Sequence, residues 1–304
     1  MNDAIEVKGL TKNYGEVKAV RGIDFHVKRG KLFAFLGPNG AGKSTTIDII
    51  CTFLKPDAGE VHVGGYELGK DDPQIRRIIG AVFQNGLLDD YLTVQENLQT
   101  RGSFYGLNGA KLDAAVHKAA KVTAITDLLK RRYDHLSGGQ RRRADIARAL
   151  IHTPEILFLD EPTTGLDPQT RRNVWETIEA IRKENGTTVF LTTHYMEEAA
   201  SADYVMVIDN GKISAQGTPA ELKDKFSKDK LVLSTTKKVE LEDLLKQNKV
   251  QYTQIADSFI IQITKSMDAL PIIELTRQYL ESFEVLKGTM DDAFIAITGK
   301  ELRE

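Results

Sequence analysis

The clearest structural signal in this chain is the stretch Gly37-Pro38-Asn39-Gly40-Ala41-Gly42-Lys43-Ser44-Thr45. It fits the pattern G-x-x-x-x-G-K-[ST], in which backbone N–H groups surround nucleotide phosphates. Residues 31–36 before it form an apolar run typical of a buried strand, and residues 44–53 after it have helical spacing. A strand, a glycine-rich loop and a helix start predict an anion site, in which Lys43 reaches the β/γ-phosphates and Ser44 holds Mg²⁺.

The composition of the 304 residues is that of an ordinary soluble globular protein with a net charge of −2, and the length suggests two domains. A strongly basic nucleic-acid-binding protein would look different. The single cysteine, Cys51, excludes a disulfide framework and a cysteine-based zinc site. No apolar run reaches the roughly 18 residues of a membrane span, and the N-terminus lacks a secretion signal. We therefore expect a cytoplasmic protein, and any membrane spans must come from another chain.

Two acidic residues follow an entirely apolar run at 156–159. Such a run fits a parallel strand that is buried on both faces, and ligands bind at the carboxyl ends of such strands. Asp160 at this position suits Mg²⁺ coordination, and Glu161 suits a general base that polarises water. The alternative is a solvated acidic turn.

Polar residues end two other predicted strands. The run at 81–83 ends at Gln84, and the buried run at 187–192 ends shortly before His194. Either residue could be purely structural. Strands alternate with helices along the chain, however, which predicts a mostly parallel sheet whose strand ends meet at one edge.

The N-terminal part of the chain is expected to form short strands at 4–7 and 24–27. Tyr14 lies between them, ahead of the phosphate-binding loop. An exposed aromatic at this place could stack on a base, and the alternative is a core or turn tyrosine. A hairpin through Asn210-Gly211 is expected to close the sheet.

Residues 93–150 are predicted to be helical, and Thr93 has a capping-box partner three residues later. A further helix over 140–151 is opened by Leu136-Ser137-Gly138-Gly139-Gln140. Ser137 suits the N-cap position. Two glycines at the start of a helix leave its backbone N–H groups accessible to a phosphate, as in the first loop. On spacing alone, an ordinary turn is the alternative.

The length of this helix leads to an expectation about distance. A helix of about 13 residues spans ~20 Å, and this one continues directly into the strand at 156–159. We therefore expect residues 136–140 to lie far from Asp160 of the same chain, so that a nucleotide bound to both requires two chains. The alternative is a bent path of the chain that brings the two together.

The sequence pattern changes after Gly217-Thr218-Pro219. The charged segment at 223–230 is expected to be a solvated helix end and a linker. Residues 231–299 then alternate predicted strands and helices, which indicates a small α+β domain without a site motif. The expected domains are therefore 1–217 and 218–304.

Taken in order, these motifs resemble the ATP-binding subunit of an ABC transporter, over residues 4 to about 217. Residues 37–45 match the phosphate-binding loop, and LSGGQ at 136–140 matches the family signature in full. By this resemblance, Asp160 is the Walker B aspartate, Glu161 the catalytic glutamate and His194 the switch histidine. The remaining matches are Gln84 as the Q-loop glutamine, Gly165-Leu166-Asp167 as the D-loop and Tyr14 as the aromatic residue that stacks on adenine.

The resemblance implies the α/β fold of a P-loop NTPase, with a RecA-like mixed sheet, a helical signature subdomain at about 86–153 and a small C-terminal α+β domain. It implies ATP and Mg²⁺ as cofactors, with Ser44, Gln84 and Asp160 as the metal ligands. The residues that would carry hydrolysis are Lys43, Gln84, Glu161 and His194.

It also implies that two such subunits, identical or different, face each other head to tail. Each ATP would lie between the phosphate-binding loop of one subunit and residues 137–140 of the other, with Asp167 among the nucleotide-binding residues. The dimer would bind a multi-span permease at the cytoplasmic face of the cell membrane. The permease would contact the surface of the ATP-binding subunit around residues 84–94. The C-terminal extension, with Met290-Asp291-Asp292-Ala293-Phe294, looks like the drug-exporter branch typified by daunorubicin-resistance ATPases, which pairs with ABC-2-type permeases.

Three other functions compete with this interpretation. A soluble ABC ATPase that acts on nucleic acid or the ribosome usually carries two cassettes, a coiled-coil insertion or zinc motifs, and this chain has none of them. A P-loop kinase or GTPase outside the ABC family would not carry LSGGQ. A regulatory binding module with a secondary ATPase activity would depend on the C-terminal domain. No nucleic-acid partner is expected, and the transported substrate stays open.

Overall fold

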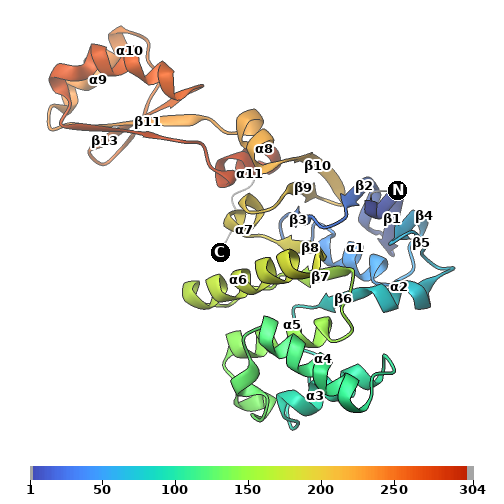
Figure 1. Cartoon of the computed structure of the whole chain (residues 1–304). Helices are drawn as coiled ribbons and strands as arrows, with labels where there is room; N and C mark the ends of the chain where they lie inside the picture. The colour runs from blue at the N-terminus through green and yellow to red at the C-terminus, as the bar shows by residue number, and fades with distance from the viewer. Residues whose placement is uncertain (1–2, 300–304) are drawn as a thin grey trace. The chain divides into compact units, whose positions relative to one another are not determined.

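The computed structural model describes residues 3–299 (Figure 1). Contacts between Cα atoms divide the chain into two units, one that ends at Gln216 and one that begins at Gly217. Each unit has a hydrophobic core of its own. No helix in the described part of the chain is long and apolar enough to cross a membrane.

A six-stranded sheet forms the centre of the first unit. Its strands, in spatial order, are β10 (Lys212–Gly217), β9 (Tyr204–Asp209), β3 (Leu32–Leu36), β8 (Thr188–Thr193), β7 (Ile156–Asp160) and β6 (Ile79–Val82). The strands from β9 to β6 are parallel to their neighbours, which confirms the predicted mostly parallel sheet. Every residue of β3, β7 and β8 is buried, as expected for continuous apolar runs covered on both faces.

A separate antiparallel sheet is built from segments on either side of the phosphate-binding loop in the sequence. Its strands are β2 (Val17–Lys28), β1 (Asp3–Tyr14), β4 (Ala58–Val63) and β5 (Tyr66–Glu67). The two short strands expected at 4–7 and 24–27 are therefore wrong in length, because both belong to strands of 12 residues. Gly9 and Gly22 have φ of 58° and 72°, and the pairing of β1 with β2 shifts register between Val7 and Leu10. These irregularities interrupt the alternation of apolar and polar residues that indicates a strand in a sequence.

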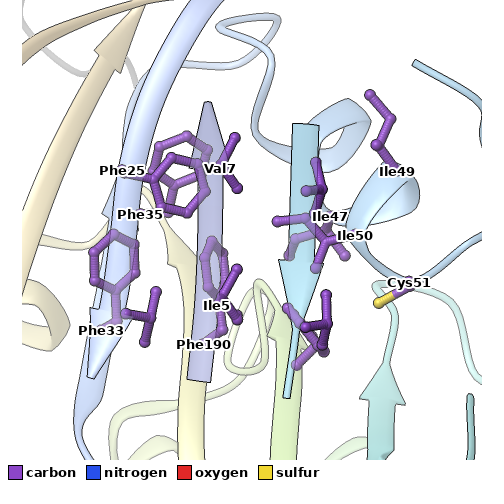
Figure 2. Close-up of a cluster of buried hydrophobic side chains, with 14 of the residues drawn as sticks. Ile5, Val7, Phe25, Phe33, Phe35, Ile47, Ile49, Ile50, Cys51 and Phe190 are labelled. Atoms are coloured by element: carbon purple, nitrogen blue, oxygen red, sulfur yellow. The ribbon is translucent and has the colours of Figure 1, made fainter. Parts of the chain in front are cut away.

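The two sheets share one core (Figure 2). The ring centroid of Phe25 on β2 lies 5.8 Å from that of Phe33 and 5.8 Å from that of Phe35, both on β3. Ile47 of α1 (Lys43–Ile50) is buried in the same cluster. This packing fixes the positions of β3 and α1, the two elements that flank the phosphate-binding loop.

The remaining helices of the first unit are α2 (Asp72–Ile78), α3 (Val94–Ser103), α4 (Gly109–Val122), α5 (Gly138–Leu150), α6 (Pro168–Asn185) and α7 (Met196–Ala200). The helices α3, α4 and α5 contact one another, and α5 also contacts β6 and α6 (Figure 1). The capping box predicted at Thr93 and the N-cap predicted at Ser137 are both present, and Ser137 also forms a capping box with Gln140. The helix after the phosphate-binding loop ends at Ile50 rather than at residue 53, and Thr52 just beyond it has a left-handed φ of 66°.

The second unit contains a four-stranded antiparallel sheet with the order β12 (Thr253–Ile255), β13 (Ser258–Ile263), β11 (Asp229–Ser234) and β14 (Ser282–Leu286). Its core joins one face of the sheet to α9 (Lys238–Gln247) and α10 (Ala269–Thr276). Two more helices, α8 (Pro219–Phe226) and α11 (Met290–Thr298), contact each other. The helix end expected in 223–230 is confirmed, because α8 ends at Phe226, but the linker expected there is wrong in extent, because β11 already begins at Asp229.

Candidate active site

The phosphate-binding loop joins the end of β3 to the start of α1, and glycine is required at two of its positions. A Cβ atom on Gly37 would collide with the backbone oxygen of Ile208 on β9. A Cβ atom on Gly42 would lie 2.5 Å from the backbone oxygen of Ala19 on β2, and Gly42 has a φ of 107°. The loop is therefore pressed between two strands, and only glycine allows this approach.

Lys43 holds its ammonium group inside this loop. Its Nζ donates hydrogen bonds to the carbonyl oxygens of Gly37 at 2.7 Å and Pro38 at 3.2 Å, and it lies 3.5 Å from Oε1 of Glu161. Burial lowers the pKa of Lys43, and the carboxylates of Glu161 and Asp160 oppose this effect. The loop thus surrounds a cation that anionic phosphates would meet on entering.

Asp160 ends the central strand β7 and is itself almost fully buried. The hydroxyl of Thr192 on the neighbouring strand β8 donates a 2.5 Å hydrogen bond to its Oδ1. The next residue, Glu161, has a left-handed φ of 46°, which few residues other than glycine adopt. This conformation turns the Glu161 side chain away from the strand and toward Lys43.

His194 follows β8 and contacts the second carboxylate oxygen of Glu161. Its Nδ1 lies 3.4 Å from Oε2 of Glu161, whereas Lys43 faces Oε1. The contact with His194, followed by the charge of Lys43, lowers the pKa of Glu161 to about 2, although burial acts in the opposite direction. Glu161 is therefore a carboxylate at neutral pH, and it joins the two basic residues at the mouth of the loop.

The signature residues lie at the N-terminus of α5. Ser137 caps this helix in a reciprocal arrangement with Gln140, and both Ser137 and Gly138 are exposed. A Cβ atom on Gly139 would collide with the side chain of Thr170 on α6. Asp167 caps α6 by accepting a 3.0 Å hydrogen bond from the backbone N–H of Thr170. Within one chain, the signature thus packs on the start of α6 and leaves Ser137 and Gly138 open to solvent.

The second turn of α5 is connected directly to the end of β7. Arg142, in that turn, donates a 2.9 Å hydrogen bond to the carbonyl oxygen of Asp160. The distance expected between residues 136–140 and Asp160 of the same chain stays a prediction.

Three other predicted residues lie on segments that border this site. Tyr14 is half exposed at the end of β1, in the hairpin whose second strand passes Gly42. Ser44 is exposed in the first turn of α1, and Gln84 is exposed shortly after β6. Their contacts with a nucleotide or a metal ion stay predictions.

Sequence reasoning missed Glu198, which connects the segments that carry Glu161 and His194. This buried residue of α7 accepts hydrogen bonds from Thr163 Oγ1, from Thr193 Oγ1 at 2.5 Å and from Trp175 Nε1 at 3.1 Å. Thr163 lies two residues after Glu161, and Thr193 comes immediately before His194. The only sequence signal was a glutamate beside two alanines in a short helix.

Replacing Glu198 by alanine is expected to destabilise the protein by about 3 kcal/mol, because three donors would lose their acceptor in a buried site. Urea denaturation of the purified variant would measure this loss. Glu197→Ala is the matched control, since Glu197 is exposed on the same helix. A similar, small loss in both variants would contradict the structural role of Glu198.

Comparison with known proteins agrees with this geometry. Residues 20–164 match the family described as "ABC transporter". The daunorubicin/doxorubicin resistance ATP-binding protein of Streptomyces peucetius is 38% identical over 97% of this chain and 92% of its own length. The linearmycin resistance ATP-binding protein of Bacillus subtilis is 34% identical over 99% of this chain and 100% of its own length.

Solved structures show the same fold. The structure of cbiO1 from Clostridium perfringens, part of the ABC transporter complex cbiONQ, has a TM-score of 0.69 and 29% identity, and covers 81% of this chain and 96% of its own. The cassette MJ0796 in a dimeric post-hydrolysis state, bound to ADP and Pi, has a TM-score of 0.64 and 29% identity over 70% of this chain and 98% of its own. These matches confirm the predicted P-loop NTPase fold and ATP as the nucleotide. The chain therefore belongs to the ABC transporter family, in which it is an ATP-binding and ATP-hydrolysing subunit.

Proposed function

We propose that this chain drives export through a separate multi-span permease of the ABC-2 type, at the cytoplasmic face of the membrane. Two ATP-binding subunits, either two copies of this chain or this chain and a related cassette, close head to tail on ATP and separate after hydrolysis. The names of the relatives support export, since they include drug-resistance ATP-binding proteins and a Nod factor export ATP-binding protein. Dimeric structures of a similar cassette support the pairing.

One observation carries the shared-site part of this proposal. Lys43, Glu161 and His194 meet at the phosphate-binding loop, whereas the exposed N-terminus of α5 at Ser137 packs on α6 of its own chain. Backbone N–H groups at a helix N-terminus favour an anion. An ATP bound by the loop of one subunit and capped by the Ser137 end of another would use both features.

The residues present suit a magnesium ion. Mg²⁺ prefers oxygen ligands and is usually held by one or two carboxylates together with substrate phosphates. Asp160 provides a buried carboxylate whose orientation Thr192 holds, while Ser44 and Gln84 provide hydroxyl and amide oxygens. When bound, the ion would neutralise charge on the β- and γ-phosphates.

The protein groups around this site have distinct tasks in the proposed reaction. Lys43 leaves the carbonyl oxygens of its own loop and bonds the incoming phosphates. Glu161, which is ionised at neutral pH, orients the attacking water and accepts its proton. His194 keeps Glu161 in place and donates to the γ-phosphate. Fixed donors of this kind are the main catalytic device in phosphoryl transfer.

The permease is proposed to sit on the surface that follows Gln84. Leu87 and Tyr91 are exposed there, with 60% and 80% of their surfaces accessible. The segment leads directly into α3 at its Thr93 cap. A cytoplasmic helix of the permease that rests on these side chains would be connected through Gln84 to the nucleotide site.

Replacing Ser137 by arginine tests the shared site. The side chain is exposed, so we expect the fold to persist with a loss of about 1 kcal/mol from the missing helix cap. In a Glu161→Gln background, ATP should produce a dimer when Ser137 is retained but only monomer when Ser137→Arg is added, as measured by analytical ultracentrifugation. Ser137→Ala is the control that removes the cap without adding bulk. Normal ATP-dependent dimers in the arginine variant would refute the shared site.

A further inference from the structure

Arg142 is a buried arginine of α5 whose guanidinium donates to three backbone carbonyl oxygens. It is 8% exposed. Its Nε donates to Pro162 at 2.7 Å, its Nη1 to Phe83 at 2.5 Å and its Nη2 to Asp160 at 2.9 Å. Three donors of one planar group therefore hold three separate peptide groups in a fixed arrangement.

The positions of these carbonyl groups matter for the site. Asp160 and Pro162 are the residues on either side of Glu161, and Phe83 comes immediately before Gln84. Glu161 has a left-handed backbone, a conformation that persists only where the surrounding structure holds it. Arg142 provides two of the hydrogen bonds that hold the chain on both sides of this residue.

We propose that Arg142 is the positioning residue that sets Glu161 for hydrolysis and ties its position to that of the signature helix. This inference rests on the proposed function, in which Glu161 orients water and the start of α5 contacts the ATP of the other subunit. Since Arg142 lies two residues after the signature in α5, a shift of this helix moves the peptide groups around Glu161. Contact of the signature with one ATP thus reaches the glutamate that acts on the other ATP.

The same helix provides a matched control in Arg148. It is 6% exposed, and its Nη2 donates a 2.6 Å hydrogen bond to the carbonyl oxygen of Ala81 on β6. Arg148 is therefore as buried as Arg142 and also bonds a backbone carbonyl near the Q-loop, but its bond is to neither neighbour of Glu161. A purely structural role would give both arginines the same effect on activity.

The test compares purified Arg142→Gln, Arg142→Lys, Arg148→Gln and Glu161→Gln with the unchanged chain. The measurements are kcat and KM for ATP, nucleotide affinity and Tm. In Arg142→Gln we expect kcat to fall at least tenfold while KM and nucleotide affinity stay within twofold. In Arg148→Gln we expect a similar fall in Tm but a kcat within twofold of the unchanged chain.

Arg142→Lys keeps the inference testable if the glutamine variant does not fold. Its ammonium keeps the charge but cannot reproduce the fork that holds the carbonyls of Asp160 and Pro162 together. We expect this variant to fold and to retain only part of the turnover, again with nucleotide affinity unchanged.

Three outcomes would overturn the inference. Equal losses of kcat in Arg142→Gln and Arg148→Gln would reduce Arg142 to a stabilising residue. If the Arg142 variants had normal kcat while Glu161→Gln was inactive, the positioning role of Arg142 would be wrong and the proposed function would stand. Normal turnover in Glu161→Gln would overturn the inference together with the proposed function on which it rests.

Discussion

Glu161→Gln is expected to lower the rate of ATP hydrolysis at least ~100-fold, the lower end of what a positioned general base contributes. Glutamine has the same shape but its amide cannot accept a proton from water. The variant also loses the negative charge that the Lys43 ammonium and His194 now face. Nucleotide affinity should stay within a few-fold, because the phosphate-binding loop is unchanged. Release of phosphate and titration with a fluorescent nucleotide would measure the two quantities.

This variant should also trap the ATP-bound dimer, since closure would occur without the reaction that reverses it. Glu197→Gln is a suitable control, because Glu197 is an exposed glutamate three residues beyond His194. Turnover at the level of the unchanged chain in Glu161→Gln would exclude Glu161 as the base and leave the Lys43–Glu161–His194 cluster without its proposed task.

Lys43→Met is expected to weaken ATP binding more than tenfold, which corresponds to about 1.4 kcal/mol. Methionine keeps an unbranched apolar side chain in the buried space but removes the cation that would bond the phosphates. Charge-assisted hydrogen bonds of this kind are about twice as strong as neutral ones. Isothermal titration with ATP and Mg²⁺ would give the affinity directly.

Lys70→Met serves as the control for lost charge, because Lys70 is an exposed lysine that pairs with Glu67 at the surface. If Lys43→Met left the ATP affinity unchanged, the ammonium group would not leave the carbonyl oxygens of Gly37 and Pro38 when nucleotide binds. The role of Lys43 in phosphate binding would then be wrong.

Most of the residues that meet at the phosphate-binding loop could be predicted because their signals are local in the sequence. The spacing of glycines and lysine in residues 37–45 specifies a loop between a strand and a helix, and apolar runs specify the buried strands β7 and β8. Since parallel strands end at one edge of a sheet, Asp160, Glu161 and His194 could be placed near this loop without coordinates. The contacts of Glu161 with Lys43 and with His194 agree with that placement.

Other features of the site depend on segments that meet only after folding. Arg142 bonds residues that lie 18, 20 and 59 positions away in the chain, and Glu198 accepts from Thr163 across 35 positions. Nothing in the neighbouring sequence marks these residues as parts of the site.

The chain order of motifs was therefore enough to identify the family and to predict that Lys43, Glu161 and His194 lie together, since these residues occur in short, strongly patterned stretches. The separate antiparallel sheet, the early start of β11 at Asp229 and the buried hydrogen bonds of Arg142 and Glu198 could be seen only in the folded chain. The reason is physical: short-range spacing reports which backbone conformation a segment prefers, whereas a buried polar group is placed by whichever distant partner satisfies it.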